Sequence, residues 1–234
     1  MSKRKMNREK QQQERNHFEL REVTPLTNNQ QTTFDAYDHG MNLILHGFAG
    51  TGKTYISLYL ALNDVLTSPS CYDKVIIVRS VVPSREMGFL PGNVREKIRI
   101  YEEPYREICD DLFGRGDGYD ILKMKNIIQF TTTSFLRGVT FNNAIVIVDE
   151  LQNMTFSELD TVMTRMGDRS RIIFSGDFRQ TDLNFEKDRN GLSDFLSITK
   201  KMSQFCYVEF GVTDIVRSGI VRDYIIQRTE FGIR

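Results

Sequence analysis

The sequence predicts an α/β domain in which a mostly parallel sheet carries helices on both faces. Short apolar runs alternate with longer helical patterns along the chain, which favours strand–helix–strand units. Residues 144–148, AIVIV, are apolar throughout, as a strand covered on both faces must be. A glycine-rich segment, residues 47–54, joins an apolar run to a helical pattern. Because parallel sheets bind ligands at the carboxyl ends of their strands, we expect a site there.

The expected elements follow in chain order. The predicted strands share short runs rich in β-branched and aromatic residues, and they are residues 41–46, 75–78, 127–130, 144–148, 171–175 and 206–210. The predicted helices share an apolar residue every three or four positions, and they are residues 54–66, 94–113, 155–166 and 214–228. Pro104 should kink or split the second of these helices. Thr155 and Glu158 form a capping-box pattern that sets the start of the third.

Length and charge suggest one domain behind a basic arm. The chain has 234 residues, enough for a single α/β domain over residues 19–234, preceded by a polar arm over residues 1–18. Residues 1–15 contain six Lys or Arg against two Glu, a net charge of +4 in a chain whose total is zero. We expect the arm to be disordered, and contact with nucleic acid is the alternative.

Composition excludes several classes of protein. No apolar run approaches the ~20 residues of a membrane-spanning helix, and no apolar stretch of a secretory signal follows the charged start. The three cysteines match no zinc spacing, so we expect reduced thiols in a cytoplasmic protein.

Residues 47–54, GFAGTGKT, match the phosphate-loop pattern G-x-x-x-x-G-K-[ST] and predict a P-loop ATPase. The expected nucleotide contacts are Gly47, Phe48, Ala49, Gly50, Thr51, Gly52, Lys53 and Thr54. Backbone N–H groups of such a loop bind phosphate oxygens, and Lys53 should reach the β- and γ-phosphates. Thr54 should offer its hydroxyl to Mg²⁺. The preceding strand and following helix argue against a simple glycine turn.

Two carboxylates end the buried strand at residues 144–148. Asp149 can hold Mg²⁺ through water, and Glu150, pointing to the other side, can polarise an attacking water. Gln180 follows a second strand end at Gly176 and could contact the γ-phosphate or that water. A charged turn after a strand is the alternative reading of the carboxylate pair.

Cations interleave with aromatic residues after the second predicted strand. The nucleic-acid candidates are Arg79, Arg85, Phe89 and Arg95, since cations bind phosphates and rings stack on bases. Several glutamates dilute this charge, so a solvated helix face with core aromatics is equally consistent with the pattern.

Together these motifs resemble the PhoH-like ATPases, a group similar in its core to superfamily 1 helicases. The resemblance runs from about Thr27 to about Ile226. It rests on the phosphate loop and on GFLPG at 88–92, LRG at 136–138, DELQN at 149–153, GDFRQTDL at 176–183 and DIVR at 214–217. Phe48 replaces the family's proline, and Ser218-Gly219 stand where His-Pro is usual.

The resemblance implies a single RecA-like P-loop NTPase domain that uses ATP and Mg²⁺. It also implies action on nucleic acid, with RNA favoured and helicase activity as the finer expectation, and it implies that Gln30 reads adenine. So short a chain is similar to phage copies, which would place it in the host cytoplasm. The rival functions are a switch or remodeller acting on protein and a small-molecule P-loop kinase.

An arginine finger is the last expectation. Superfamily 1 helicases take an arginine for the γ-phosphate from a second RecA-like domain, and this chain has length for only one. We therefore expect a homo-oligomer, with a hexameric ring favoured, in which Arg217 of a neighbouring copy supplies the cation; Arg137 and Arg165 are alternatives.

Overall fold

A six-stranded parallel sheet organises the part of the chain that the structure describes. The computed structural model describes residues 19–67, 69–80, 94–177 and 186–231, with the backbone alone for 94–98 and 186–190. The strands are β1 (Asn42–Gly47), β2 (Lys74–Arg79), β3 (Ile128–Thr132), β4 (Ala144–Asp149), β5 (Arg171–Gly176) and β6 (Phe205–Phe210). Their spatial order is β3-β2-β4-β5-β1-β6, and every neighbouring pair is parallel. All six carboxyl ends therefore lie at one edge of the sheet.

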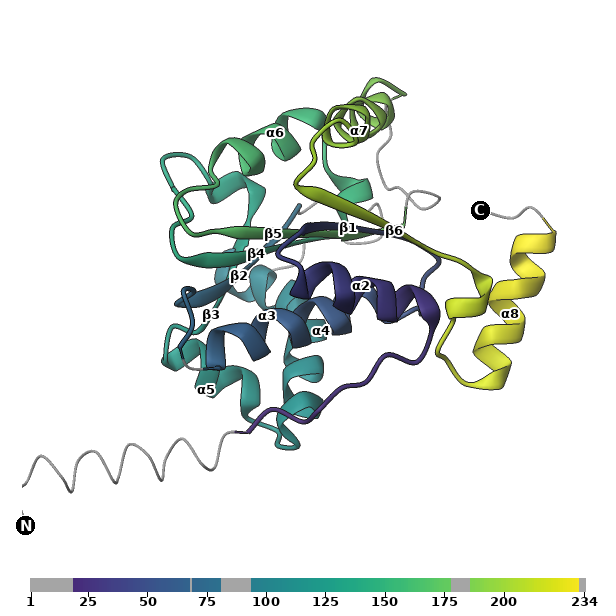
Figure 1. The fold of residues 1–234 in the computed structure, drawn as a ribbon, viewed down its shortest axis with the longest axis horizontal. Helices are drawn as coiled ribbons and strands as arrows, with labels where there is room; N and C mark the ends of the chain where they lie inside the picture. The colour runs from purple at the N-terminus through teal and green to yellow at the C-terminus, as the bar shows by residue number, and fades with distance from the viewer. Residues whose placement is uncertain (1–18, 68, 81–93, 178–185, 232–234) are drawn as a thin grey trace, which may run out of the picture.

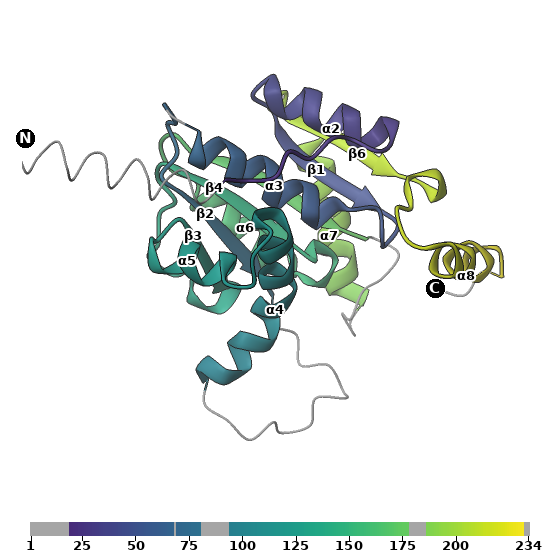
Figure 2. The same ribbon diagram turned by 90° about the horizontal axis from the view of Figure 1, so that it is seen from below.

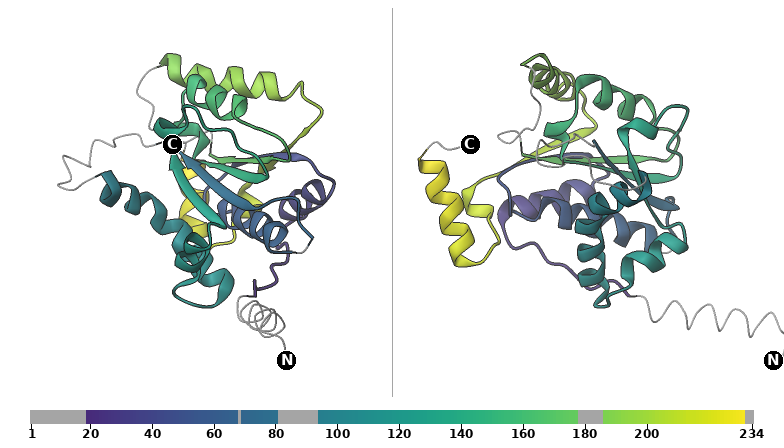
Figure 3. Two further views of the ribbon diagram at one scale, coloured as in Figure 1. Left: turned by 90° about the vertical axis from the view of Figure 1, so that its left-hand side faces the viewer. Right: turned by 180° about the vertical axis from the view of Figure 1, so that it is seen from behind.

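Helices cover both faces of this sheet, which confirms the predicted fold class. One face carries α2 (Asn28–Asp38), α3 (Lys53–Leu66), α4 (Val94–Phe113) and α5 (Gly118–Met124) (Figures 1 and 2). The other carries α6 (Phe156–Thr164) and α7 (Glu186–Thr199) (Figure 1). The last helix, α8 (Gly219–Glu230), lies beyond the carboxyl end of β6 (Figures 1 and 3) and has no buried residue. No helix in the described ranges is long and apolar enough to cross a membrane.

Strand β4 shows why the central strands are apolar throughout. Ile145 and Ile147 pack into the core beneath α3 and α4, whereas Val146 and Val148 pack into the core beneath α6 and α7. All six residues of β4 are buried. Because successive side chains point to opposite faces and both faces are covered, the five residues of β4 before Asp149 are all apolar. Burying each such side chain contributes about 1.5–3 kcal/mol.

The predicted strands are confirmed within two residues at each end, and so is the start of α6. Thr155 Oγ1 accepts a hydrogen bond from the backbone N–H of Glu158, and the Glu158 carboxylate accepts one from the N–H of Thr155. This reciprocal pair is the capping box that the sequence indicates.

Helix α4 runs through Pro104 without a break, so of the two predicted effects of this proline, a kink or a split, the split is wrong. A proline inside a helix costs about 3 kcal/mol because it removes one hydrogen bond and crowds the preceding turn. Tyr105 and Leu112 after the proline are fully buried, and Glu102 before it accepts hydrogen bonds from Lys123 of α5. Packing on both sides of the proline therefore outweighs the local cost.

The final helix begins at Gly219, and the prediction that it begins at Asp214 is wrong. Residues Val212–Asp214 form a 3-10 turn, and the buried Asp214 carboxylate accepts hydrogen bonds from the N–H of Gly211 and the amide of Asn29. Asp214 thus joins the end of β6 to α2. Helices α2, α5 and α7 were not predicted, and the polar sequence of α2 shows why: NNQQTTFDAYD lacks an apolar stripe.

Candidate functional site

The loop between β1 and α3 curls at the carboxyl edge of the sheet. Gly47, Gly50 and Gly52 have φ values of 124°, 75° and 84°, which side chains rarely adopt. Gly47 is also pressed against β6, since a Cβ atom there would lie 2.1 Å from the carbonyl oxygen of Phe210. The N–H of Phe48 donates to that same oxygen at 3.1 Å. The loop is therefore fixed to the edge strand at its start.

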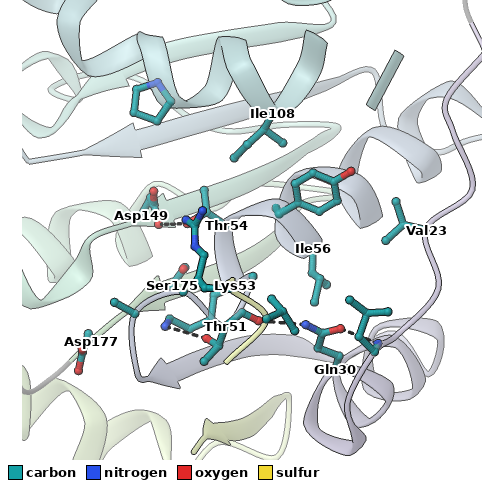
Figure 4. A pocket seen from close by; sticks show the side chains of 18 of the residues that line it. Val23, Gln30, Thr51, Lys53, Thr54, Ile56, Ile108, Asp149, Ser175 and Asp177 are labelled. Atoms are coloured by element: carbon teal, nitrogen blue, oxygen red, sulfur yellow. Dashed lines mark hydrogen bonds between the residues drawn. The ribbon is translucent and has the colours of Figure 1, made fainter. Parts of the chain in front are cut away.

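Lys53 directs its charge into this loop. Its ammonium donates to the carbonyl oxygens of Gly47 at 2.9 Å and Phe48 at 2.6 Å, and to Thr51 Oγ1 at 3.3 Å. The side chain is buried, and Figure 4 shows it beside Thr51. A phosphate bound by the loop would meet this ammonium.

Thr54 and Asp149 form the pair that fits a magnesium ion. Thr54 Oγ1 donates to Asp149 Oδ1 at 3.0 Å, and the buried Tyr105 hydroxyl donates to Oδ2 at 2.9 Å (Figure 4 shows the first bond). Hydroxyl and carboxylate oxygens are ligands that Mg²⁺ prefers, and nucleotide sites complete its shell with phosphate and water. The described residues contain no cluster of three or more His, Cys, Asp or Glu side chains for a metal. The pair thus fits a nucleotide-bound ion rather than an all-protein site.

Glu150 combines an uncommon backbone conformation with a side chain that is bonded to Gln152. Its backbone lies in the left-handed region at φ 54°, an uncommon conformation for a residue with a side chain. The Gln152 amide donates to the Glu150 carboxylate, and Gln152 Oε1 accepts the N–H of Asp177 at 3.1 Å. Burial, and then the adjacent Asp149 carboxylate, raise the pKa of Glu150.

Gln152 is a site residue that the sequence analysis did not assign. It joins Glu150 to the end of β5 and is itself buried. Gly176 makes room for it, because a Cβ atom there would lie 2.4 Å from Gln152 Oε1. The available signal was its place in the DELQN segment beside the two carboxylates.

A cavity of about 860 Å³ joins these groups, within the ~300–1,000 Å³ usual for ligand sites. It extends from the carboxylates across the loop to the segment before α2 (Figure 4). Its walls include Glu22, Val23, Thr24, Leu26, Gln30, the loop residues 49–56, Pro104, Glu107, Ile108, Asp111, Asp149, Glu150, Gln152, Ser175, Gly176, Asp177, Val216 and Arg217.

Gln30 lies at the wall of this cavity and is tied to the loop. Its Nε2 donates to the carbonyl oxygen of Thr51 at 3.0 Å, and its Oε1 accepts the N–H of Leu26 at 2.7 Å (Figure 4). A glutamine amide offers two N–H donors and two lone pairs, so capacity for one more bond of each kind is left. Adenine recognition by Gln30 stays a prediction.

Arg217 lies against the phosphate loop of its own chain. The N–H of Val216 donates to the carbonyl oxygen of Gly50 at 3.0 Å, and a Cβ atom at Gly50 would lie 2.8 Å from Arg217 Cγ. Arg217 also lines the cavity of its own chain, and its service to a neighbouring copy stays a prediction. Arg137, exposed after β3, and Arg165, at the end of α6, do not line that cavity.

The nucleic-acid candidates are placed only in part. Arg79 ends β2, is partly exposed, and its guanidinium carbon lies 5.5 Å from the ring centroid of Tyr101 on α4; its contact with nucleic acid stays a prediction. Arg85, Phe89 and Gln180 lie outside the described residues, and only the backbone of Arg95 is described, within α4.

Comparison with known proteins shows the family to which this chain belongs. The family description "PhoH-like protein" matches residues 22–228. A PhoH-like protein of Mycobacterium leprae is 32% identical over 212 residues, which cover 89% of this chain and 59% of the relative. A PhoH-like protein of Bacillus subtilis is 33% identical over 76% of this chain and 55% of its own length. Protein PhoH of Escherichia coli K12 is 34% identical over 74% and 49%.

The chain thus spans about half to three-fifths of the length of these curated relatives. Among solved structures, the DUF1998 helicase MrfA bound to DNA aligns with 79% of this chain and 27% of its own, at a TM-score of 0.47 and 12% identity. A likeness this loose carries no argument about activity.

Proposed function

Because this chain belongs to the PhoH-like protein family, we propose that it hydrolyses ATP with Mg²⁺ and couples hydrolysis to a nucleic acid, with RNA favoured. One observation supports this most: a phosphate-loop lysine, a Thr–Asp pair and a half-buried glutamate share one cavity. These are the parts that phosphoryl transfer to water uses.

Each of these residues has a separate task in the proposal. The N–H groups of the loop and Lys53 bind the β- and γ-phosphates, and Thr54 with Asp149 holds Mg²⁺, which supplies neutralising charge. Tyr105 keeps the Asp149 carboxylate in place through its hydrogen bond. Glu150 orients the attacking water and accepts its proton. Arg217 supplies a further cation within the same chain.

Two rival functions differ from the proposed one. A small-molecule kinase would use a different acceptor of the phosphoryl group, and a protein remodeller would act on a different partner. A small-molecule kinase brings its own hydroxyl acceptor and has no use for a glutamate held at the cavity by Gln152. A remodeller of protein would share the ATPase site but respond to a different partner. The hydrogen bond from Gln152 to the Glu150 carboxylate therefore favours ATP hydrolysis over phosphoryl transfer to a small molecule.

We expect phosphate release from ATP and Mg²⁺ without any acceptor, and faster release with single-stranded RNA. The experiment measures the steady-state rate alone and with single-stranded RNA, single-stranded DNA and duplex, in the presence and absence of a chelator. An acceptor-free rate of zero would contradict the ATPase proposal. A rate that no nucleic acid changes would instead favour the protein remodeller.

Replacing Gln30 by alanine should weaken ATP binding more than GTP binding. The remaining N–H and lone pair of the Gln30 amide would form hydrogen bonds with adenine. Without them, the site no longer discriminates against guanine. The measurement is the ratio of dissociation constants for ATP and GTP. Gln31→Ala is the matched control, because Gln31 is exposed and its amide bonds only locally, to Asp35.

An equal loss of both affinities would give Gln30 a different role. Its amide would then serve only to hold the Thr51 carbonyl, and with it the shape of the loop.

The hexameric ring and the cytoplasmic location stay predictions. The argument for a ring is the need for a neighbour's arginine, and Arg217 at the cavity of its own chain offers a second source of that cation. Light scattering of the active species measures the copy number directly.

A further inference from the structure

Residues 211–217, called here the crossing segment, run from the end of β6 to the phosphate loop. The N–H of Val216 donates to the carbonyl oxygen of Gly50 at 3.0 Å. The next side chain, Arg217, lies against the same glycine, since a Cβ atom at Gly50 would lie 2.8 Å from Arg217 Cγ and 3.5 Å from its Nε. Arg217 also lines the cavity. The backbone just before Arg217 therefore sets where this side chain meets the loop.

A buried carboxylate fixes the course of the crossing segment. Asp214 is 2% exposed, and its Oδ2 atom accepts hydrogen bonds from the N–H of Gly211 at 2.8 Å and from Nδ2 of Asn29 at 2.7 Å. The first bond closes the 3-10 turn within the segment, and the second joins the segment to the first turn of α2. Because a buried carboxylate is costly without such donors, both bonds constrain the position of the turn.

The first turn of α2 is bonded to the phosphate loop as well. Gln30, the residue after Asn29, donates from Nε2 to the carbonyl oxygen of Thr51 at 3.0 Å (Figure 4). Helix α2 thus bonds the crossing segment through one side chain and the loop through the next, while the crossing segment bonds the loop directly. Loss of the bond from Asn29 would free the crossing segment from α2 and leave the bond from Gln30 in place.

We propose that Asp214 and Asn29 are a pair of positioning residues that hold Arg217 over the phosphate loop of its own chain for the hydrolytic step. The inference rests on the proposed ATPase function. An arginine that neutralises charge in the transition state of phosphoryl transfer contributes about 10³–10⁵-fold in rate. A displacement of about 1 Å at such a group costs on the order of 10²-fold.

The test measures kcat and KM for ATP in Asn29→Ala, Asp214→Ala and Asp214→Asn. For Asp214→Ala we expect kcat to fall on the order of 10²-fold with KM changed by less than about threefold, and for Asn29→Ala a smaller fall of about tenfold. Asp214→Asn should recover most of kcat, because both hydrogen bonds end on one oxygen and the amide also provides one. In an Arg217→Ala background, neither alanine should lower the residual single-turnover rate further.

The matched control is Asn28→Ala, a substitution of the same residue type at an exposed position in the same turn of α2. It should leave kcat unchanged. The ratio of dissociation constants for ATP and GTP should stay constant in Asn29→Ala, because Gln30 keeps its own bond to Thr51. A shift in that ratio at constant kcat would mean that the pair serves α2 and not Arg217, and it would overturn the inference.

Three further results would also contradict it. These are an unchanged kcat in both alanine variants, an equal fall in the Arg217→Ala background, and recovered turnover in a mixture of Lys53→Ala and Arg217→Ala proteins, which would place the arginine in a neighbouring copy. If Asp214→Ala does not fold, Asn29→Ala alone must show the fall in kcat at constant KM. A wild-type chain without turnover would overturn the proposed function, whereas an active wild type with unchanged variants would overturn this inference alone.

Discussion

Replacing Lys53 by alanine is expected to abolish ATP hydrolysis, mostly by removing nucleotide binding. The ammonium is the buried cation inside the phosphate loop, and hydrogen bonds from a charged donor contribute about 1.5–3 kcal/mol each. Losing two such bonds to phosphate would weaken binding by about 10²-fold or more, at tenfold per 1.4 kcal/mol. The measurement is the dissociation constant for ATP by calorimetry, beside the rate of phosphate release.

The control for Lys53 is Lys201→Ala, an exposed lysine after α7. The dissociation constant of the Lys201→Ala protein for ATP should match that of the wild type. A Lys53→Ala protein that still binds ATP tightly would place the phosphates elsewhere than in this loop.

Replacing Glu150 by glutamine should leave ATP bound and stop its turnover. The amide matches the carboxylate in shape, and the Thr54–Asp149 pair that would hold Mg²⁺ is untouched. An amide cannot accept the proton of the attacking water, so we expect the rate to fall by about 10²–10⁴-fold. Single-turnover hydrolysis and equilibrium binding of ATP, measured on the same preparation, separate the two effects.

Asp160→Asn on the exposed side of α6 is the control for Glu150. A Glu150→Gln protein that turns over at a near-normal rate would show that another group activates the water. A protein that no longer binds ATP would assign Glu150 a structural role.

Local patterns predicted the strands and the phosphate loop because these depend on neighbours in sequence. The run 144–148 is apolar because each residue faces one of two cores, and the glycines of residues 47–54 have the positive φ values that the loop requires. The position of Asp149 at a strand end was likewise readable, since parallel strands end at one edge.

The contacts between elements were not readable from the sequence. The bond from Tyr105 to Asp149 spans 44 positions and exists because α4 packs against β4 and the strands beside it. Helical periodicity marks Tyr105 as apolar core and gives no sign of its hydroxyl partner. The place of Arg217 beside the phosphate loop was not readable for the same reason: only the fold reveals that the chain after β6 returns to Gly50.

The contact between Gly47 and Phe210 changes how this signature motif should be understood in evolution. The requirement for glycine at the first position of the pattern is usually explained by nucleotide binding. Here any side chain at Gly47 would clash with the backbone of the edge strand β6. A mutational scan would score Gly47 as indispensable even if no phosphate touched it. In a relative that lacks an edge strand at this place, that constraint would be absent and the position free to drift.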